Sequence, residues 1–191
     1  MSIDFLTSVL NNMENPKKEN RTKAAFIVLE NPDLIKFLVE LTFDTQNKIS
    51  IKAAWILEWI CTHHGITHII PYLDTFCSHI KYVTLDSATR PCAKICEHLA
   101  NAYTSKKDNP IKTILKNEHI DLIIETGFDW LITPQKIAVK AYTMQTLYLF
   151  GNYRNWVHPE LSHIIQTQVI QQSKGCEVRG KKILELIKKI K

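Results

Sequence analysis

The stretch Lys52-Ala53-Ala54-Trp55-Ile56-Leu57-Glu58 decides the fold, because it nearly repeats Lys23-Ala24-Ala25-Phe26-Ile27-Val28-Leu29-Glu30. Weaker echoes follow as Arg90-Pro91-Cys92-Ala93, Lys140-Ala141-Tyr142 and Arg179-Gly180-Lys181. The residues that follow the base in the five copies are Ala24, Ala53, Pro91, Ala141 and Gly180. The steps between these positions are 29, 38, 50 and 39 residues, and steps of this length are typical of helical hairpin repeats.

The rest of the chain also has the pattern of helices. Apolar residues recur at helical spacing, and no Asn-Gly or Asp-Gly hairpin signal is present. Prolines follow Asn31, Asn109 and Thr133, which are therefore predicted N-caps. We expect almost no strand. The predicted helix pairs are 2–14 with 19–30, 32–44 with 48–63, 66–83 with 87–104, 110–131 with 134–151, and 158–172 with 176–190.

Two irregularities are expected within these pairs. Pro71 lies inside an apolar helical run and should kink the 66–83 helix, because proline lacks the backbone N–H that a helix interior needs. The 110–131 stretch should break near Asn117, which would account for the 50-residue step. The second helix of each pair is apolar on most sides and should be sandwiched, while the first is more amphipathic and should lie outside. Alanine and glycine at the repeated position would let neighbouring helices approach closely.

A base followed by alanine and an apolar helix, preceded by a proline-bent first helix, resembles the HEAT and armadillo-like repeat families. The resemblance extends from about Arg21 to the C-terminus, although the repeat lengths are uneven. It implies an all-α fold of the α-α superhelix type, a right-handed solenoid of about five helical hairpins whose second helices line a concave face. Residues 1–191 would form one such domain, with a basic capping helix at 176–190.

Composition limits the classes of function. A chain of 191 residues suits one domain, and its five glycines are not clustered as a phosphate-binding loop requires. The N-terminus carries Asp4 where a signal peptide would carry bases, and no apolar run reaches the roughly 18 residues of a membrane span. The five cysteines form no disulfide framework and are expected to be reduced. We therefore expect a cytoplasmic protein without a membrane span, and no cofactor is indicated.

The net charge of +5 arises from the end of the chain. Residues 174–191 contain seven Lys and Arg against two Asp and Glu. The rest of the chain then has 17 bases and 17 acids, since the totals are 24 and 19. The body is therefore neutral, and the overall charge is weak evidence for a nucleic-acid partner.

Three Cys-x-His triplets begin at Cys61, Cys77 and Cys96, with Cys92 one turn before the last of them. Structural zinc sites favour cysteine pairs on turns, whereas Cys-x-His on a helix points its two side chains roughly 200° apart. Buried thiols are favoured over a metal site, so no metal ligand is predicted.

Aromatic residues and bases on the second helices offer candidate binding groups. Trp55 and Trp59 lie one turn apart with Glu58 between them, which is typical of a packed core. The arrangement also resembles the alkylpurine DNA glycosylases with HEAT-like repeats, and that resemblance implies aromatic and carboxylate contacts to a cationic damaged base. Bases occur near the start of the second helices as the pairs Arg21 and Lys23, Lys48 and Lys52, Arg90 and Lys94, Lys136 and Lys140, and Arg179 and Lys181.

These bases admit two interpretations. They form a structural ladder that pairs with acids such as Glu30, Glu58, Asp86 and Glu97, or they form a stripe that binds phosphates. We favour the ladder. The candidate binding residues are Lys52, Trp55, Glu58, Trp59, Arg90, Lys94, Lys136 and Lys140.

No catalytic motif such as Gly-x-Ser-x-Gly or His-Glu-x-x-His is present, so no catalytic residue is predicted. The expected function is a non-enzymatic HEAT-like scaffold that binds a protein or peptide. The alternative is a nucleic-acid-binding HEAT-like protein related to the alkylpurine DNA glycosylases. A third alternative is an enzyme whose chemistry leaves no recognisable sequence motif.

Overall fold

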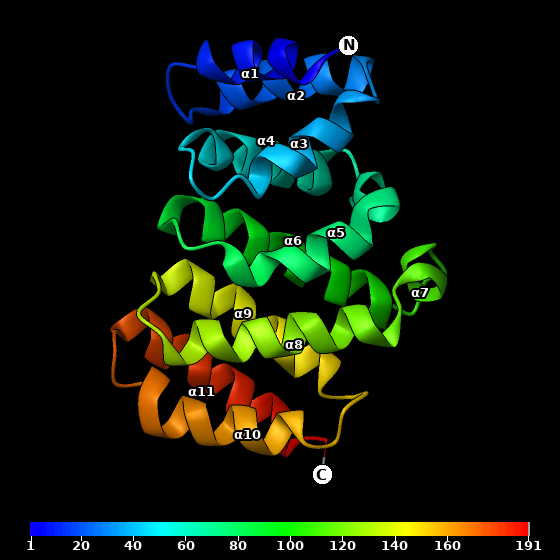
Figure 1. Cartoon of the computed structure of the whole chain (residues 1–191). Coiled ribbons are helices and arrows are strands. Elements are labelled where there is room, and N and C mark those ends of the chain that lie inside the picture. The colour runs from blue at the N-terminus through cyan, green and yellow to red at the C-terminus, as the bar shows by residue number, and fades with distance from the viewer. Residues whose placement is uncertain (191) are drawn as a thin grey trace. The chain divides into compact units, whose positions relative to one another are not determined.

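The computed structural model describes residues 1–190, and Lys191 lies outside the described residues. Helices make up 76% of the structure, with eleven α-helices and no strand in the described residues (Figure 1). The predicted all-α class is confirmed. Contacts divide the chain into two compact units, Met1–Ile95 and Cys96–Lys191, and α6 (Asp86–Thr104) begins in the first and ends in the second. The single domain and the serial order of a solenoid remain predictions.

The first unit is built around α4 (Ile49–His63). This helix packs against α1 (Ile3–Asn11), α2 (Lys18–Glu30), α3 (Leu34–Thr42) and the 3-10 helix η1 (Ile66–Tyr72). Its alanines Ala53 and Ala54 and the larger Ile56, Leu57 and Ile60 are all completely buried. A helix that is apolar on most sides needs neighbours on most sides, which explains its central position.

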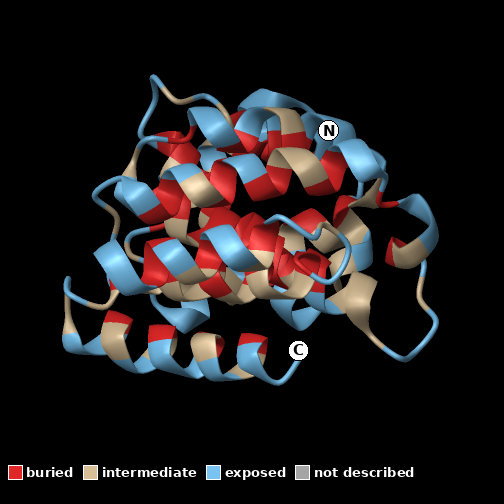
Figure 2. Ribbon diagram, turned by 90° about the horizontal axis from the view of Figure 1, so that it is seen from below, coloured by how far each residue is buried: buried red, intermediate tan, exposed pale blue. Residues whose placement is uncertain are grey.

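The second unit is built around α9 (Ile137–Phe150) in the same way. This helix contacts α8 (Asn117–Ile132), α10 (Val157–Ile164) and α11 (Lys174–Lys188). A π-helical segment, η3 (Ile165–Val169), follows α10 and also contacts α11. The central helix of each unit is thus the second member of a predicted pair. Figure 2 shows helices with buried residues along one side and exposed residues along the other.

Close helix packing in the second unit depends on Gly180 of α11. A Cβ atom at this position would lie 2.9 Å from Cγ2 of Ile165 and 3.0 Å from Cγ2 of Ile170. Both distances are shorter than normal carbon contacts, so the position requires glycine. The expectation that the residue after the repeated base is small because helices approach there is confirmed at this copy.

The predicted 66–83 helix is instead three short helices. Gly65, with φ of 116°, turns the chain after α4 into η1, which contains Pro71. α5 (Leu73–His79) and the 3-10 turn η2 (Ile80–Tyr82) follow. Proline removes one N–H from the hydrogen-bond ladder, and the chain takes up 3-10 geometry around it rather than a single kink.

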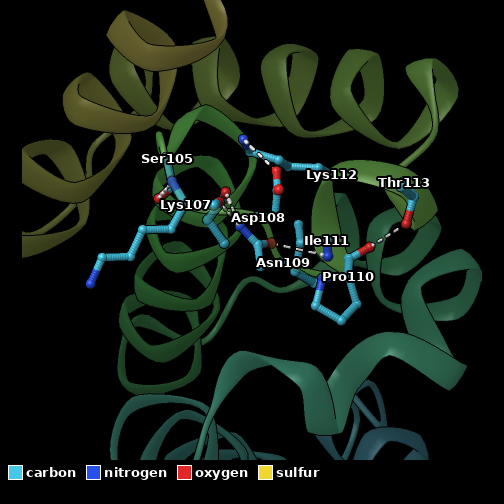
Figure 3. Close-up of polar contacts among 9 residues, drawn as sticks. Ser105, Lys107, Asp108, Asn109, Pro110, Ile111, Lys112 and Thr113 are labelled. Atoms are coloured by element: carbon cyan, nitrogen blue, oxygen red, sulfur yellow. Dashed lines mark hydrogen bonds and ion pairs between the residues drawn. The ribbon is translucent and has the colours of Figure 1, made fainter.

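The predicted break near Asn117 is confirmed, since the short α7 (Ile111–Ile114) ends before α8 begins. Asn109 precedes α7 and holds the loop around it (Figure 3). Its Oδ1 accepts a hydrogen bond from the Ile111 N–H at 3.1 Å, while its Nδ2 donates to the Lys107 carbonyl at 3.1 Å. Lys112 and Asp108 form an ion pair across the same loop at 4.0 Å.

The predicted N-cap at Asn109 is one residue early, since the N-cap of α7 is Pro110, and the other two predicted N-caps are wrong. Asn31 ends α2, where its side chain donates to the Ile27 carbonyl at 2.9 Å. Thr133 likewise ends α8, where its hydroxyl donates to the Asp129 carbonyl at 2.6 Å. The following helices begin two or more residues further on. The prolines therefore lie in the connections between helices.

Candidate functional site

Glu58 of α4, one of the candidate binding residues, is the centre of a side-chain cluster in the first unit. Its side chain is only 9% exposed, and Oε2 lies 3.9 Å from Nη1 of Arg21 and 4.0 Å from Nη2 of Arg90. Its other oxygen, Oε1, accepts a hydrogen bond from the hydroxyl of Thr62 at 3.0 Å. One buried carboxylate thus balances two arginines, one from α2 and one from α6.

Trp59 extends this cluster into an aromatic stack. The Arg21 guanidinium carbon lies 4.6 Å from the centre of the Trp59 ring, a cation–π distance. The His63 ring stacks on the same tryptophan with centroids 3.8 Å apart, and its Nδ1 donates to the Trp59 carbonyl at 3.1 Å. Trp59 itself is 7% exposed. The tryptophan is therefore already covered by the protein's own cation.

Trp55 contacts α6 at a place where the helix lacks one of its hydrogen bonds. Pro91 has no N–H to donate to the carbonyl of Ser87, four residues before it. The indole Nε1 of Trp55 donates to that carbonyl at 3.0 Å. Trp55 thus satisfies the acceptor that Pro91 leaves open, which is a structural role.

The lysines of the candidate set lie apart from this cluster. Lys52 donates to the Asn11 carbonyl at the end of α1, at 3.2 Å. Lys140 is 1% exposed and donates from Nζ to the Leu131 carbonyl near the end of α8, at 2.9 Å. Burial lowers the pKa of Lys140. Lys94 is half-buried in α6, and Lys136 is exposed at the start of α9.

The arginine and glutamate pairing recurs in the second unit. Nη2 of Arg179 lies 3.6 Å from Oε1 of Glu97 and also donates to Oε1 of Gln145 at 3.2 Å. The Glu97 side chain is 9% exposed, the same as that of Glu58. In both units the base of a repeat copy is directed onto a buried carboxylate. This geometry is the one that the structural ladder predicts.

A hollow of about 470 Å³ between α8 and α10 lies outside the candidate set. Phe128 and Trp156 stack beside it with centroids 5.4 Å apart, and Trp156 is 53% exposed. Three carboxylates also line it, those of Glu125, Asp129 and Glu160. The sequence did carry a signal, since Glu125, Phe128, Asp129 and Ile132 have the three- and four-residue spacing of one helix face.

The Cys-x-His triplets do not converge. Cys61, Cys77, Cys92 and Cys96 are buried, whereas His63 and His79 are exposed. Burial raises the pKa of the Cys77 and Cys92 thiols to about 12, which opposes the thiolate form that metals bind. Among residues 1–190, no three His, Cys, Asp or Glu side chains form a group able to hold a metal ion.

No protein-family model matches this sequence, and no curated protein matches it closely enough to identify a family. Within residues 1–190, no helix combines the length and the apolar character needed to cross a bilayer.

Proposed function

We propose that the chain is a non-enzymatic scaffold of the HEAT-like type, a solenoid of about five helical hairpins that binds a protein or a peptide. The architecture is supported by the two units, each of which is built around the second helix of a predicted pair. It is also supported by the small residues Ala24, Ala53 and Gly180, all buried at repeated positions.

The internal use of the repeat bases favours a protein partner over a nucleic acid. Arg21 and Arg90 face Glu58, Arg179 faces Glu97, and Lys140 is buried against a carbonyl. Nucleic-acid affinity depends on accessible bases that neutralise phosphates. The alternative, a relative of the alkylpurine DNA glycosylases, needs an open aromatic and carboxylate pair. Here Glu58 is ion-paired with two arginines, and the ring of Trp59 is covered by Arg21 and His63.

The observation that carries the proposal is the exposed apolar surface around the hollow between α8 and α10. Trp156 is 53% exposed and Ile132 is 51% exposed, and both line the hollow. Tryptophan is enriched where proteins bind one another, because its large ring buries much area when a partner covers it. We assign the partner-binding site to this hollow.

Selection from a random peptide display library on the immobilised full chain tests the proposal. We expect a family of related peptides to be enriched, and a synthetic member to bind saturably in solution. Binding should weaken in Trp156→Ala and persist in Val178→Ala, which removes an exposed side chain from α11. If no peptide of any composition binds saturably, the chain is not a peptide-binding scaffold.

A further inference from the structure

Three carboxylates and one histidine, His163, line the hollow between α8 and α10. Glu125 and Asp129 lie one turn apart on α8, and Glu160 lies on α10. Within residues 1–190, none of these three carboxylates has an ion-pair partner. No lysine or arginine lines the hollow either. Like charges held together without a lysine or arginine between them repel one another, so a cation that enters is attracted by all three.

The net charge of +5 comes from residues 174–191, and the rest of the chain is neutral. Several carboxylates elsewhere are paired, as Glu177 is with Lys174 and Lys181 and as Asp121 is with Arg154. The hollow is therefore a local negative patch on a chain whose body is neutral overall. Complementary charge steers a partner to such a patch and disfavours acidic partners.

The stacked rings of Phe128 and Trp156 indicate which kind of cation the hollow would bind. Phe128 stacks on Trp156 with ring planes 29° apart, which leaves Trp156 half-exposed at the edge of the hollow. Tryptophan is the strongest aromatic partner for a cation, and a planar guanidinium can stack on it while it binds carboxylates. The neighbouring Ile132 and Ile164 supply apolar contact for the residues beside the cation.

We propose that this hollow binds an arginine-bearing segment of a partner protein. The guanidinium stacks on Trp156 and pairs with the carboxylates of Glu125 and Glu160, and an apolar residue of the same segment covers Ile132. This inference rests on the proposed function and names its partner class as a basic peptide with interspersed apolar residues.

The test uses the full chain and a short labelled peptide in which arginines alternate with leucines. A second peptide, with citrulline at every arginine, has the same shape without the charge. We expect the arginine peptide to bind, to change the tryptophan fluorescence, and to bind more tightly than the citrulline peptide. The doubly changed Glu125→Gln, Glu160→Gln chain should bind it about fivefold to tenfold more weakly, and Trp156→Ala about fivefold more weakly.

The matched control is Glu185→Gln, which removes an exposed carboxylate from α11 and should leave the affinity unchanged. Equal binding of the arginine and citrulline peptides, or equal affinity of the wild-type and doubly changed chains, overturns the inference. The scaffold function would still stand if peptides of another composition bind. Self-association of the chain that disappears in Trp156→Ala would show that a second copy occupies the hollow, and it also overturns the inference.

Discussion

Ala54→Glu is expected to unfold the protein or to lower its melting temperature by about 10 °C or more. Ala54 is completely buried in α4, the helix that contacts α1, α2, α3 and η1. A carboxylate there would be buried one helical turn from Glu58, whose own charge already engages Arg21 and Arg90, and like charges at this spacing repel one another. An unpaired buried charge costs several kcal/mol, a large part of the stability of an ordinary domain.

Thermal unfolding followed by circular dichroism measures this effect. Val178→Glu is the control, because it adds the same carboxylate at a helical position that is 62% exposed. The control should change the melting temperature little. An unchanged melting temperature in Ala54→Glu would mean that α4 is not the central helix of its unit.

Gly180→Leu is the second change with a large expected effect. Even the first carbon of a side chain would lie 2.9 Å from Ile165 and 3.0 Å from Ile170. Both contacts are to branch methyls near the backbone, which have few rotamers with which to move away. Overpacking of this kind costs about 1–3 kcal/mol for small additions, and leucine adds three further carbons. The better helix propensity of leucine compared with glycine would stabilise the protein by only about 1 kcal/mol.

Chemical denaturation measures the loss, with Val178→Leu as the control on the same helix. Val178 is exposed, so the larger side chain meets no packed neighbour, and the unfolding midpoint should stay close to that of the wild type. A midpoint for Gly180→Leu equal to that of the control would contradict the close approach of α11 to η3.

The helices could be predicted from the sequence because their signal is local. The expected 48–63 and 134–151 ranges correspond closely to α4 and α9, and the expected break near Asn117, which accounts for the 50-residue step, lies just before α8. Asn31 and Thr133 were misassigned as caps because their side chains bond backward to carbonyls of the preceding helix. Sequence alone does not say in which direction such a residue bonds.

The candidate site was predictable only in part. The pairing of repeat bases with Glu58 and Glu97 was anticipated, because acids and bases recur at related positions of the repeats. The role of Trp55 could not be predicted, because it depends on a carbonyl of another helix, that of Ser87, which receives no hydrogen bond from Pro91. The hollow beside Trp156 joins residues from two helices more than 20 positions apart. No local sequence pattern predicts that these two helices will pack together and form a hollow.

The central claim is that Arg21, Arg90, Lys140 and Arg179 serve the protein's own carboxylates and carbonyls rather than phosphates. Titration of labelled duplex DNA with the wild-type chain at about 50 mM salt tests this directly, because phosphate contacts are strongest at low salt. We predict no saturable binding under these conditions. Tight binding that weakens steeply as salt is added, and that persists when the exposed lysines of residues 174–191 are changed to glutamine, would contradict the claim, since it would require several of these bases to be available to DNA.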